Sequence, residues 1–355
     1  MAKEGMMSDK GNPLLSWPGA VQASWPDEGV AAHYGDPMRE QRALDGAGDA
    51  VAGLVDRSNR GVLKITGADR LSWLHSLTTQ HLAGLTAGGS AEALVLSPTG
   101  HVEHHLSLSD DGTTVWVHVE PGTAPALTAF LTSMKFMLRV EVADLSADTA
   151  VLTVMGPAGA DITAGLEGVL GRVSPGPFGI IDLIVARDLL AGLAAELAGR
   201  GAVPAGMWAF EALRIAARAP RFGLDTDHRT IPHEVGWIET AVHLSKGCYR
   251  GQETVARVHN LGHPPRRLVF LDLDGSVDRL PAHGSPVELD GATAGFTGSA
   301  ARHYELGPIG LALVKRTVPV DATLLADGVA AAQEVIVPPD AGANVQVTLR
   351  RRQVI

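Results

Sequence analysis

The pair Pro264-Pro265 divides this chain into two parts of different character. Proline lacks a backbone N–H and fixes its own φ, so two in a row continue neither a helix nor a central strand. After the pair come short apolar runs separated by Gly and Asp turns, at residues 268–273, 285–289, 292–298 and 308–314. Short strands at such regular spacing are typical of a small antiparallel barrel or sandwich.

Before Pro264 the apolar pattern alternates between two periods. Continuous or alternating apolar runs predict strands, and a spacing of three to four residues predicts helices. The expected strands are 61–66, 93–96, 102–108, 114–119, 139–142, 151–154 and 182–185, and the expected helices are 71–77, 126–134, 187–198 and 204–217. Residues 221–237 are polar and are expected to form a loop. Mixed helices and strands followed by strands alone predict an α+β fold.

The same pattern predicts the domain boundaries. Residues 1–27 are rich in Gly, Pro, Ser and charge, and we expect a flexible N-terminal tail there. We place a region of two αβ subdomains at 28–263 and a C-terminal β domain at 264–355. A chain of 355 residues is long enough for two or three domains.

Composition excludes several classes of protein. The formal net charge is −10 at pH 7, with 39 acidic against 29 basic residues, which argues against a broad nucleic-acid-binding surface. No run of about 18 apolar residues exists to span a membrane, and the N-terminus lacks the apolar stretch of a signal peptide. One cysteine forms no internal disulfide and does not by itself hold an iron–sulfur cluster. We therefore expect a cytoplasmic protein.

That single cysteine, Cys248, lies in the segment with the most chemistry. Glycines stand near it on both sides, and Lys246, Arg250 and Arg257 surround it. We expect a helix to begin at Gly251. Cations and a helix N-terminus both favour the thiolate, which is the reactive form of a cysteine. A reactive thiol is one interpretation and a buried structural cysteine in a tight turn is the other; local chemistry alone favours neither.

The segment also resembles a known family. The letters Lys246-Gly-Cys-Tyr249, then Gly251-Gln-Glu253 and Arg257, resemble the signature of the YgfZ-type folate-binding proteins, a branch of the superfamily of the glycine-cleavage aminomethyltransferase. A weaker similarity runs from Val51 to the final strands. The resemblance implies an aminomethyltransferase-like body of ferredoxin-like subdomains around a central cavity, with a C-terminal antiparallel β-barrel. It also implies tetrahydrofolate or a one-carbon derivative as cofactor, and iron–sulfur enzymes or their assembly factors as partners.

The resemblance extends to individual positions that would contact folate. They are Lys246, Arg214, Asp182, Glu234, Gln252 and Arg257. Arg214 matches the arginine of a Leu-Arg-x-Glu-Ala-Gly stretch, although Ala216-Ala-Arg218 replaces its last three letters. Asp182 falls near an acidic pterin-binding segment whose glycine motif is degraded to Gly176-Pro-Phe-Gly179. An ion pair at a helix surface is the alternative role for Arg214, and a structural hydrogen bond is the alternative for Glu234.

The hairpin predicted around Ser97-Pro-Thr-Gly100 departs from the family pattern. In the aminomethyltransferases that this chain resembles, a Gly-Gly-x-x-Asp-Asp stretch follows this turn and supplies a catalytic aspartate. The corresponding stretch here is Gly100-His-Val-Glu-His104-His105. Loss of both carboxylates changes how a proton is handled at the folate nitrogen. His101, Glu103 and His105 have a period-two spacing that suits zinc, but no further ligand completes a site, and a solvated hairpin face is the alternative.

These features favour a tetrahydrofolate-binding accessory protein that supports assembly or repair of iron–sulfur enzymes, with Cys248 as its reactive thiol. The alternative is a folate-dependent transferase of one-carbon units, and a third hypothesis is a scaffold with protein-binding surfaces only. The histidines at positions 104 and 105 favour the first over the second, so standard aminomethyl transfer is not expected. We expect no metal site. The sequence does not decide whether the chain catalyses a reaction.

Overall fold

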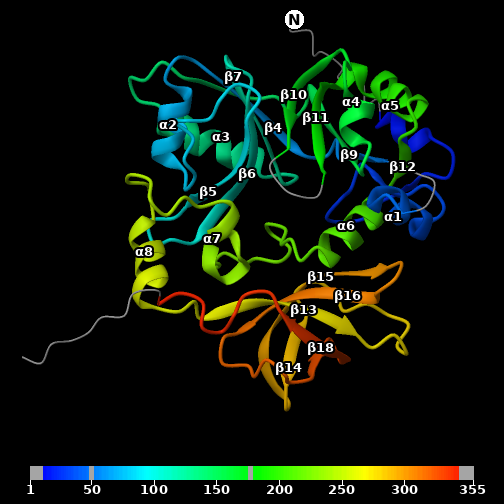
Figure 1. Cartoon of the computed structure of the whole chain (residues 1–355), viewed down its shortest axis with the longest axis vertical. Coiled ribbons are helices and arrows are strands. Elements are labelled where there is room, and N and C mark those ends of the chain that lie inside the picture. The colour runs from blue at the N-terminus through cyan, green and yellow to red at the C-terminus, as the bar shows by residue number, and fades with distance from the viewer. Residues whose placement is uncertain (1–10, 48–51, 175–178, 344–355) are drawn as a thin grey trace, which may run out of the picture. The chain divides into compact units, whose positions relative to one another are not determined.

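The computed structural model describes residues 11–47, 52–174 and 179–343. Contacts divide the chain into two compact units, whose elements are labelled in Figure 1. The first unit comprises residues 1–70, 85–91 and 107–213, and the second comprises residues 71–84, 92–106 and 214–355. None of the described helices is long and apolar enough to cross a membrane.

One five-stranded sheet lies wholly in the first unit. Its order is β10-β11-β9-β3-β12, with strands Val169–Val173, Ile181–Ala186, Thr149–Met155, Gly53–Asp56 and Val203–Ala205. Only the β12–β3 pair is parallel among these strands. Helix α5 (Leu190–Gly199) packs against β3 and β9. Leu152, Leu183 and Leu193 are buried in the core of this layer.

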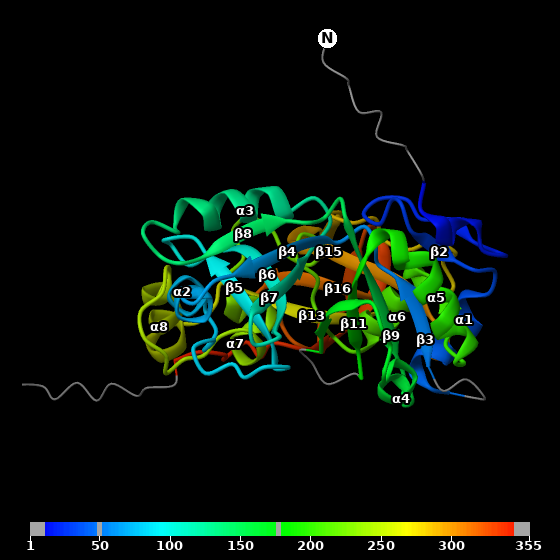
Figure 2. The same cartoon turned by 90° about the horizontal axis from the view of Figure 1, so that it is seen from above.

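The other five-stranded sheet has the order β5-β6-β7-β4-β8. Its strands are Ser90–Leu96, Val102–Asp110, Thr114–Val119, Gly61–Thr66 and Glu141–Asp144. Strands β5 and β6 each run from one unit into the other. Helix α3 (Ala124–Ser133) packs on β4 and β8 (Figure 2). The predicted strands 61–66 and 114–119 coincide with β4 and β7; β7 is buried along its whole length, and β4 is buried at every residue except Lys64 and Thr66.

Residues 11–27 are folded, so the prediction of a flexible tail is wrong for them. A 3-10 helix, η1 (Pro13–Ser16), buries Leu14 in the core that contains Leu152. The Asn12 amide donates to Asp56 Oδ2 at 2.6 Å. The buried Leu14 and the Asn12 amide thus fix residues 11–27, although the composition of this stretch is typical of disordered segments. Residues 1–10 and Val51 lie outside the described residues.

Further elements near the N-terminus were not predicted. Strands β1 (Val21–Gln22) and β2 (Ala31–His33) pair antiparallel. Helix α1 (Pro37–Asp45) begins at Asp36, whose carboxylate accepts from the Met38 and Arg39 amides, and ends at Gly46 with φ +72°. These short elements carry too few apolar residues for their period to be recognised.

Two predicted helices begin later than expected. Residues 203–205 form the edge strand β12, and helix α6 spans Met207–Ala216. Pro204 is compatible with this edge position, and Gly206 is required because a Cβ there would lie 2.3 Å from the Ala32 carbonyl oxygen. The helix predicted at 187–198 starts as a 3-10 turn, η2 (Arg187–Leu189), and continues as α5. A further short helix, α4 (Gly159–Thr163), comes before α5 in the sequence.

The second unit contains a closed antiparallel barrel of order β13-β16-β15-β14-β17-β18, drawn in yellow to red in Figure 1. Its strands are Arg266–Leu273, Gly307–Lys315, Ala292–His303, Pro286–Leu289, Leu324–Ala326 and Val329–Val335. The structure thus confirms the predicted antiparallel barrel over a sandwich. β17 and β18 were missed because their sequence is rich in alanine, although Asp327-Gly328, with positive φ at both residues, forms the turn between them. Residues 344–355 lie outside the described part.

Short helices complete the second unit. They are η3 (Pro232–Val235), α7 (Trp237–Thr240), α8 (Gln252–Leu261) and all but the first residue of α2 (Arg70–Leu77). The segment 221–237, predicted as a loop, therefore contains one turn of 3-10 helix and the start of α7. η3 packs against α7, α8 and β13, so this segment is part of the core framework of the unit.

Candidate functional site

The cysteine lies in an extended loop that ends at helix α8. Gly251, with φ +81°, is the N-cap of the helix, and Glu253 lies in its first turn, so the predicted helix start is confirmed. Cys248 is exposed and is not part of a disulfide. The alternative of a buried structural cysteine is therefore wrong, because the residue is exposed to solvent.

Lys246 fixes this loop, which we call the cysteine loop (residues 246–251), to the end of helix α2. Its Nζ donates to the carbonyl oxygens of His75, Thr78 and, at 3.2 Å, Gln80. A cation at this position satisfies carbonyls that a helix end leaves unpaired. Burial lowers the pKa of Lys246 to about 8, and the ammonium also lies 5.1 Å from the Tyr249 ring centroid. All three N–H groups have protein acceptors, so in this structure Lys246 is an anchor.

The cysteine loop also packs on the hairpin turn between β5 and β6. A Cβ at Gly251 would lie 2.5 Å from the Ser97 carbonyl oxygen and 3.1 Å from Gly100 Cα, so only glycine fits. Arg250 Nη1 lies 2.6 Å from the Glu103 carboxylate, and Thr254 Oγ1 donates to the Thr99 carbonyl at 2.8 Å. The structure therefore brings the cysteine loop and the histidine-bearing hairpin together, which sequence analysis did not predict.

The hairpin histidines that replace the aspartate pair have different surroundings. Burial lowers the pKa of His104, an effect that the charge of Arg250 reinforces and that of Glu103 opposes. The His105 ring stacks on Trp237 with centroids 4.7 Å apart and planes 9° from parallel. Its Nε2 lies 3.7 Å from the Glu92 carboxylate. No group of three or more His, Cys, Asp or Glu side chains within the described ranges is placed to hold a metal ion.

Gln252 and Arg257 occupy the first and second turns of α8. The Gln252 Oε1 accepts from the Tyr249 amide at 3.1 Å, which ties the helix start back to the cysteine loop. Arg257 is exposed, and within the described residues its guanidinium forms no hydrogen bond or ion pair. Of the predicted folate-binding residues, Arg257 is thus the one whose charge is available to a ligand.

Arg214 and Glu234 form buried ion pairs elsewhere in the second unit. Arg214 Nη1 lies 2.9 Å from Asp225 Oδ2, and Nη2 donates to Ser299 Oγ at 2.6 Å. Glu234 is fully buried; its Oε1 accepts from Arg266 Nε at 2.8 Å and its Oε2 from the Ile231 amide at 3.1 Å. Glu234 therefore makes the structural hydrogen bonds of its alternative role, whereas Arg214 forms a buried ion pair and not one at a helix surface.

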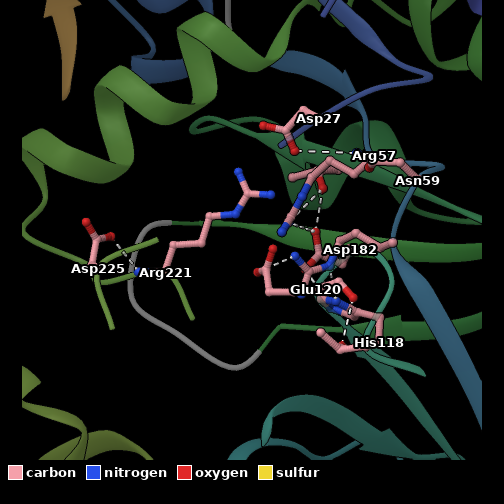
Figure 3. A network of polar contacts seen from close by, with 11 residues as sticks. Asp27, Arg57, Asn59, His118, Glu120, Asp182, Arg221 and Asp225 are labelled. Carbon is pink, nitrogen blue, oxygen red and sulfur yellow. Dashed lines mark hydrogen bonds and ion pairs between the residues drawn. The ribbon is translucent and has the colours of Figure 1, made fainter. Parts of the chain in front are cut away.

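Asp182 belongs to the first unit and lies at the centre of a buried polar network (Figure 3). Its Oδ1 accepts from Thr153 Oγ1 at 2.5 Å and lies 3.3 Å from Arg57 Nη1, and its Oδ2 lies 2.9 Å from His118 Nε2. Burial raises the pKa of Asp182, but the charge of Arg57 and the hydrogen bonds from His118 and Thr153 outweigh burial and hold that pKa well below its usual range. The carboxylate is thus ionised and surrounded by protein groups. The predicted neighbours Gly176 to Phe178 lie outside the described residues.

Apart from Asp182, the residues of this network were missed by sequence analysis. Arg60 Nε donates to His118 Nδ1 at 2.8 Å and its Nη1 lies 2.7 Å from the Glu120 carboxylate. Burial lowers the pKa of His118 to about 4, so the ring is neutral near pH 7 and its remaining proton is on Nε2, toward Asp182. Arg57 also lies over the Phe210 ring at 4.6 Å. The residues are too far apart in sequence for any local pattern to relate them.

Comparisons with known proteins agree with this architecture. The family model described as the GCVT N-terminal domain matches residues 47–171. A chloroplastic protein of Arabidopsis thaliana, named as a transferase, is 25% identical over 320 residues, which are 80% of this chain and 70% of the relative. An aminomethyltransferase of Rubrobacter xylanophilus is 30% identical over 291 residues, 74% of this chain and 76% of the relative.

A solved structure has the same fold. The glycine cleavage system aminomethyltransferase T of Bartonella henselae superposes with a TM-score of 0.76 at 20% sequence identity. The match covers 92% of this chain and 96% of that protein. At this identity the likeness establishes the fold and leaves the activity to be argued from the residues.

Proposed function

Because this chain belongs to the aminomethyltransferase family, we propose that it is a YgfZ-type tetrahydrofolate-binding accessory protein that supports assembly or repair of iron–sulfur enzymes. The family's fold, with mixed helices and strands and a closed C-terminal barrel, is present. Folate binding, the cytoplasmic location and the iron–sulfur partners are parts of the proposal.

The observation that carries the proposal is the exposed thiol on an anchored loop. Cys248 is solvent-exposed while Lys246, two residues away, holds three backbone carbonyls and Gly251 is packed on the hairpin turn. A loop held at both ends presents its cysteine in a defined position, as a group that reacts with a bound partner or ligand requires.

The hairpin argues for an accessory role over transfer chemistry. Histidines stand where the resemblance places a catalytic aspartate, and burial keeps the pKa of His104 below its usual value. A neutral imidazole lacks the negative charge with which a carboxylate stabilises a protonated folate nitrogen. We therefore expect no aminomethyltransferase activity. The assay supplies an aminomethyl-lipoyl carrier and tetrahydrofolate. Turnover near 1 s⁻¹, which is on the order of an ordinary enzyme, would instead show that the chain is the alternative, a one-carbon transferase.

Folate binding is tested by calorimetric titration of the purified chain with tetrahydrofolate. We expect saturable binding, and we expect Arg257→Ala to weaken it about tenfold, because a hydrogen bond to a charged group is worth about 1.5–3 kcal/mol. Arg257 has no side-chain partner within the described residues, so its loss should leave stability unchanged. Arg39→Ala, at an exposed position of α1 in the other unit, is the matched control and should bind folate normally. Absence of saturation up to about millimolar folate contradicts the proposal.

A further inference from the structure

A half-open groove of about 870 Å³ lies in the second unit, and its lining includes Ser245, the residue before the cysteine loop. Helix α7 and the loop that follows it form one wall, and residues 336–342, which follow the last barrel strand, form another. A groove of this volume lies within the usual range of about 300–1,000 Å³ for small-molecule sites. None of the residues that we assigned to the thiol or to folate lines it.

The second wall is fixed against α8. A Cβ at Gly342, which has φ +87°, would lie 2.3 Å from the Gly262 carbonyl oxygen. The Ala343 amide donates to the Val258 carbonyl at 3.3 Å, and the His263 ring contacts the Ala341 carbonyl at 2.9 Å. Defined contacts with α8 and the residues after it therefore hold the second wall in place.

His233 lines the groove with unsatisfied polar atoms. The residue is 3% exposed, and within the described part of the chain neither ring nitrogen has a hydrogen-bond partner. Burial, with the nearby His259, lowers the pKa of His233 to about 4, so the ring is neutral and offers one donor and one acceptor. Buried polar groups are almost always paired, and an unpaired one in a groove indicates a missing partner.

The remaining lining combines an apolar surface with groups that favour an anion. Val235, Trp237, Val242 and Val337 are buried side chains that line the groove. Of its five titratable residues four are Arg218 or histidines, and one, the exposed Glu239, is acidic. Arg218 is held by its ion pair with Glu334 and by stacking on the Phe270 ring at 4.7 Å.

We propose that this groove binds a small amphiphilic organic anion, whose apolar body contacts the valines and Trp237 and whose acidic group faces Arg218 and the histidines. The proposal does not rest on folate binding, and none of residues 246–251 lines the site.

The test uses a pair of fluorescent probes that differ in one charge. 1-Anilinonaphthalene-8-sulfonate is an aromatic anion, and N-phenyl-1-naphthylamine is the same ring system without the sulfonate. We expect the anion to bind one site per chain with a dissociation constant of about 100 μM or tighter, and the neutral probe to bind at least several-fold more weakly. Equal affinities, or no saturable site, would overturn the proposal.

Two variants locate the site. Arg218→Gln should weaken binding of the anionic probe about tenfold, because it removes the charge of an exposed residue. It should leave binding of the neutral probe unchanged. His233→Leu should weaken binding of the anionic probe. It should not lower the thermal stability of the protein, since it removes unpaired polar atoms from a buried position. His228→Leu, at an exposed histidine outside the groove, is the control. Unchanged binding in both groove variants would overturn the assignment.

Competition separates this groove from the folate site. Saturating tetrahydrofolate should leave the affinity for the anionic probe unchanged, and displacement of the probe would overturn the claim of a separate site. Failure of folate to bind, with the probe bound as expected, would contradict the proposed function and leave this inference supported.

Discussion

Arg266→Met is expected to lower the free energy of unfolding by about 4 kcal/mol. Arg266 donates from Nε and Nη2 to Glu234 and from Nη1 to Asp227, and the Glu234 side chain is fully buried. Removing the arginine leaves a buried carboxylate without its cation, which is among the most destabilising single changes. Chemical denaturation of the full chain measures the loss.

The control for this prediction is an ion pair with the same fork geometry at the surface. Arg139 contacts both oxygens of Asp69 but its side chain is 75% exposed, so Arg139→Met should cost only a small part of the stability that Arg266→Met loses. Adding Glu234→Leu to Arg266→Met should recover much of the lost stability, because the uncompensated charge is then removed. Equal losses in the two single variants would show that burial of Glu234 does not decide the effect.

Gly251→Ala is expected to lower stability by about 3 kcal/mol and to displace the cysteine loop. The residue has φ +81°, which an L side chain rarely adopts, and the new Cβ would collide with the backbone at Ser97 and Gly100. Gly247→Ala, four residues earlier in the same motif, meets no atom within 4 Å and does not have positive φ, so it should fold normally. Thermal unfolding and the rate of Cys248 alkylation measure both effects.

The two outcomes of that comparison are distinct. If the hairpin contact positions the thiol, only Gly251→Ala should change the alkylation rate of the native protein. If the two glycine variants behave alike, the packing of Gly251 on the hairpin turn does not hold the loop.

Much of the fold is predictable because it depends on local patterns. The strand at 114–119 is buried throughout, the strand at 61–66 is buried except at Lys64 and Thr66, and the first four barrel strands lie between Gly and Asp turns. Where a few long-range contacts decide, the local pattern misleads. Leu14 and Asn12 order a polar stretch, and Pro204 lies in an edge strand although it resembles the first residue of a helix.

The candidate site divides in the same way. The helix start at Gly251 follows from the order of neighbouring residues and was predicted. The anchoring of Lys246 was not, because its acceptors are 166 to 171 residues away in sequence, and the Arg250–Glu103 pair spans 147 residues. The network around Asp182 joins residues up to 125 positions apart. Side-chain partners at such separations depend on the tertiary fold, which a single sequence does not specify pair by pair.

The central claim, that an exposed and anchored Cys248 serves iron–sulfur enzymes, is tested most directly by Cys248→Ser in cells that lack the protein. Because the thiol is exposed, this change should leave folding and tetrahydrofolate binding intact. We measure the activity of iron–sulfur enzymes in those cells, with Gly247→Ala as the control in the same loop. The account predicts that Gly247→Ala restores the activity and Cys248→Ser does not. Full restoration by Cys248→Ser would contradict it.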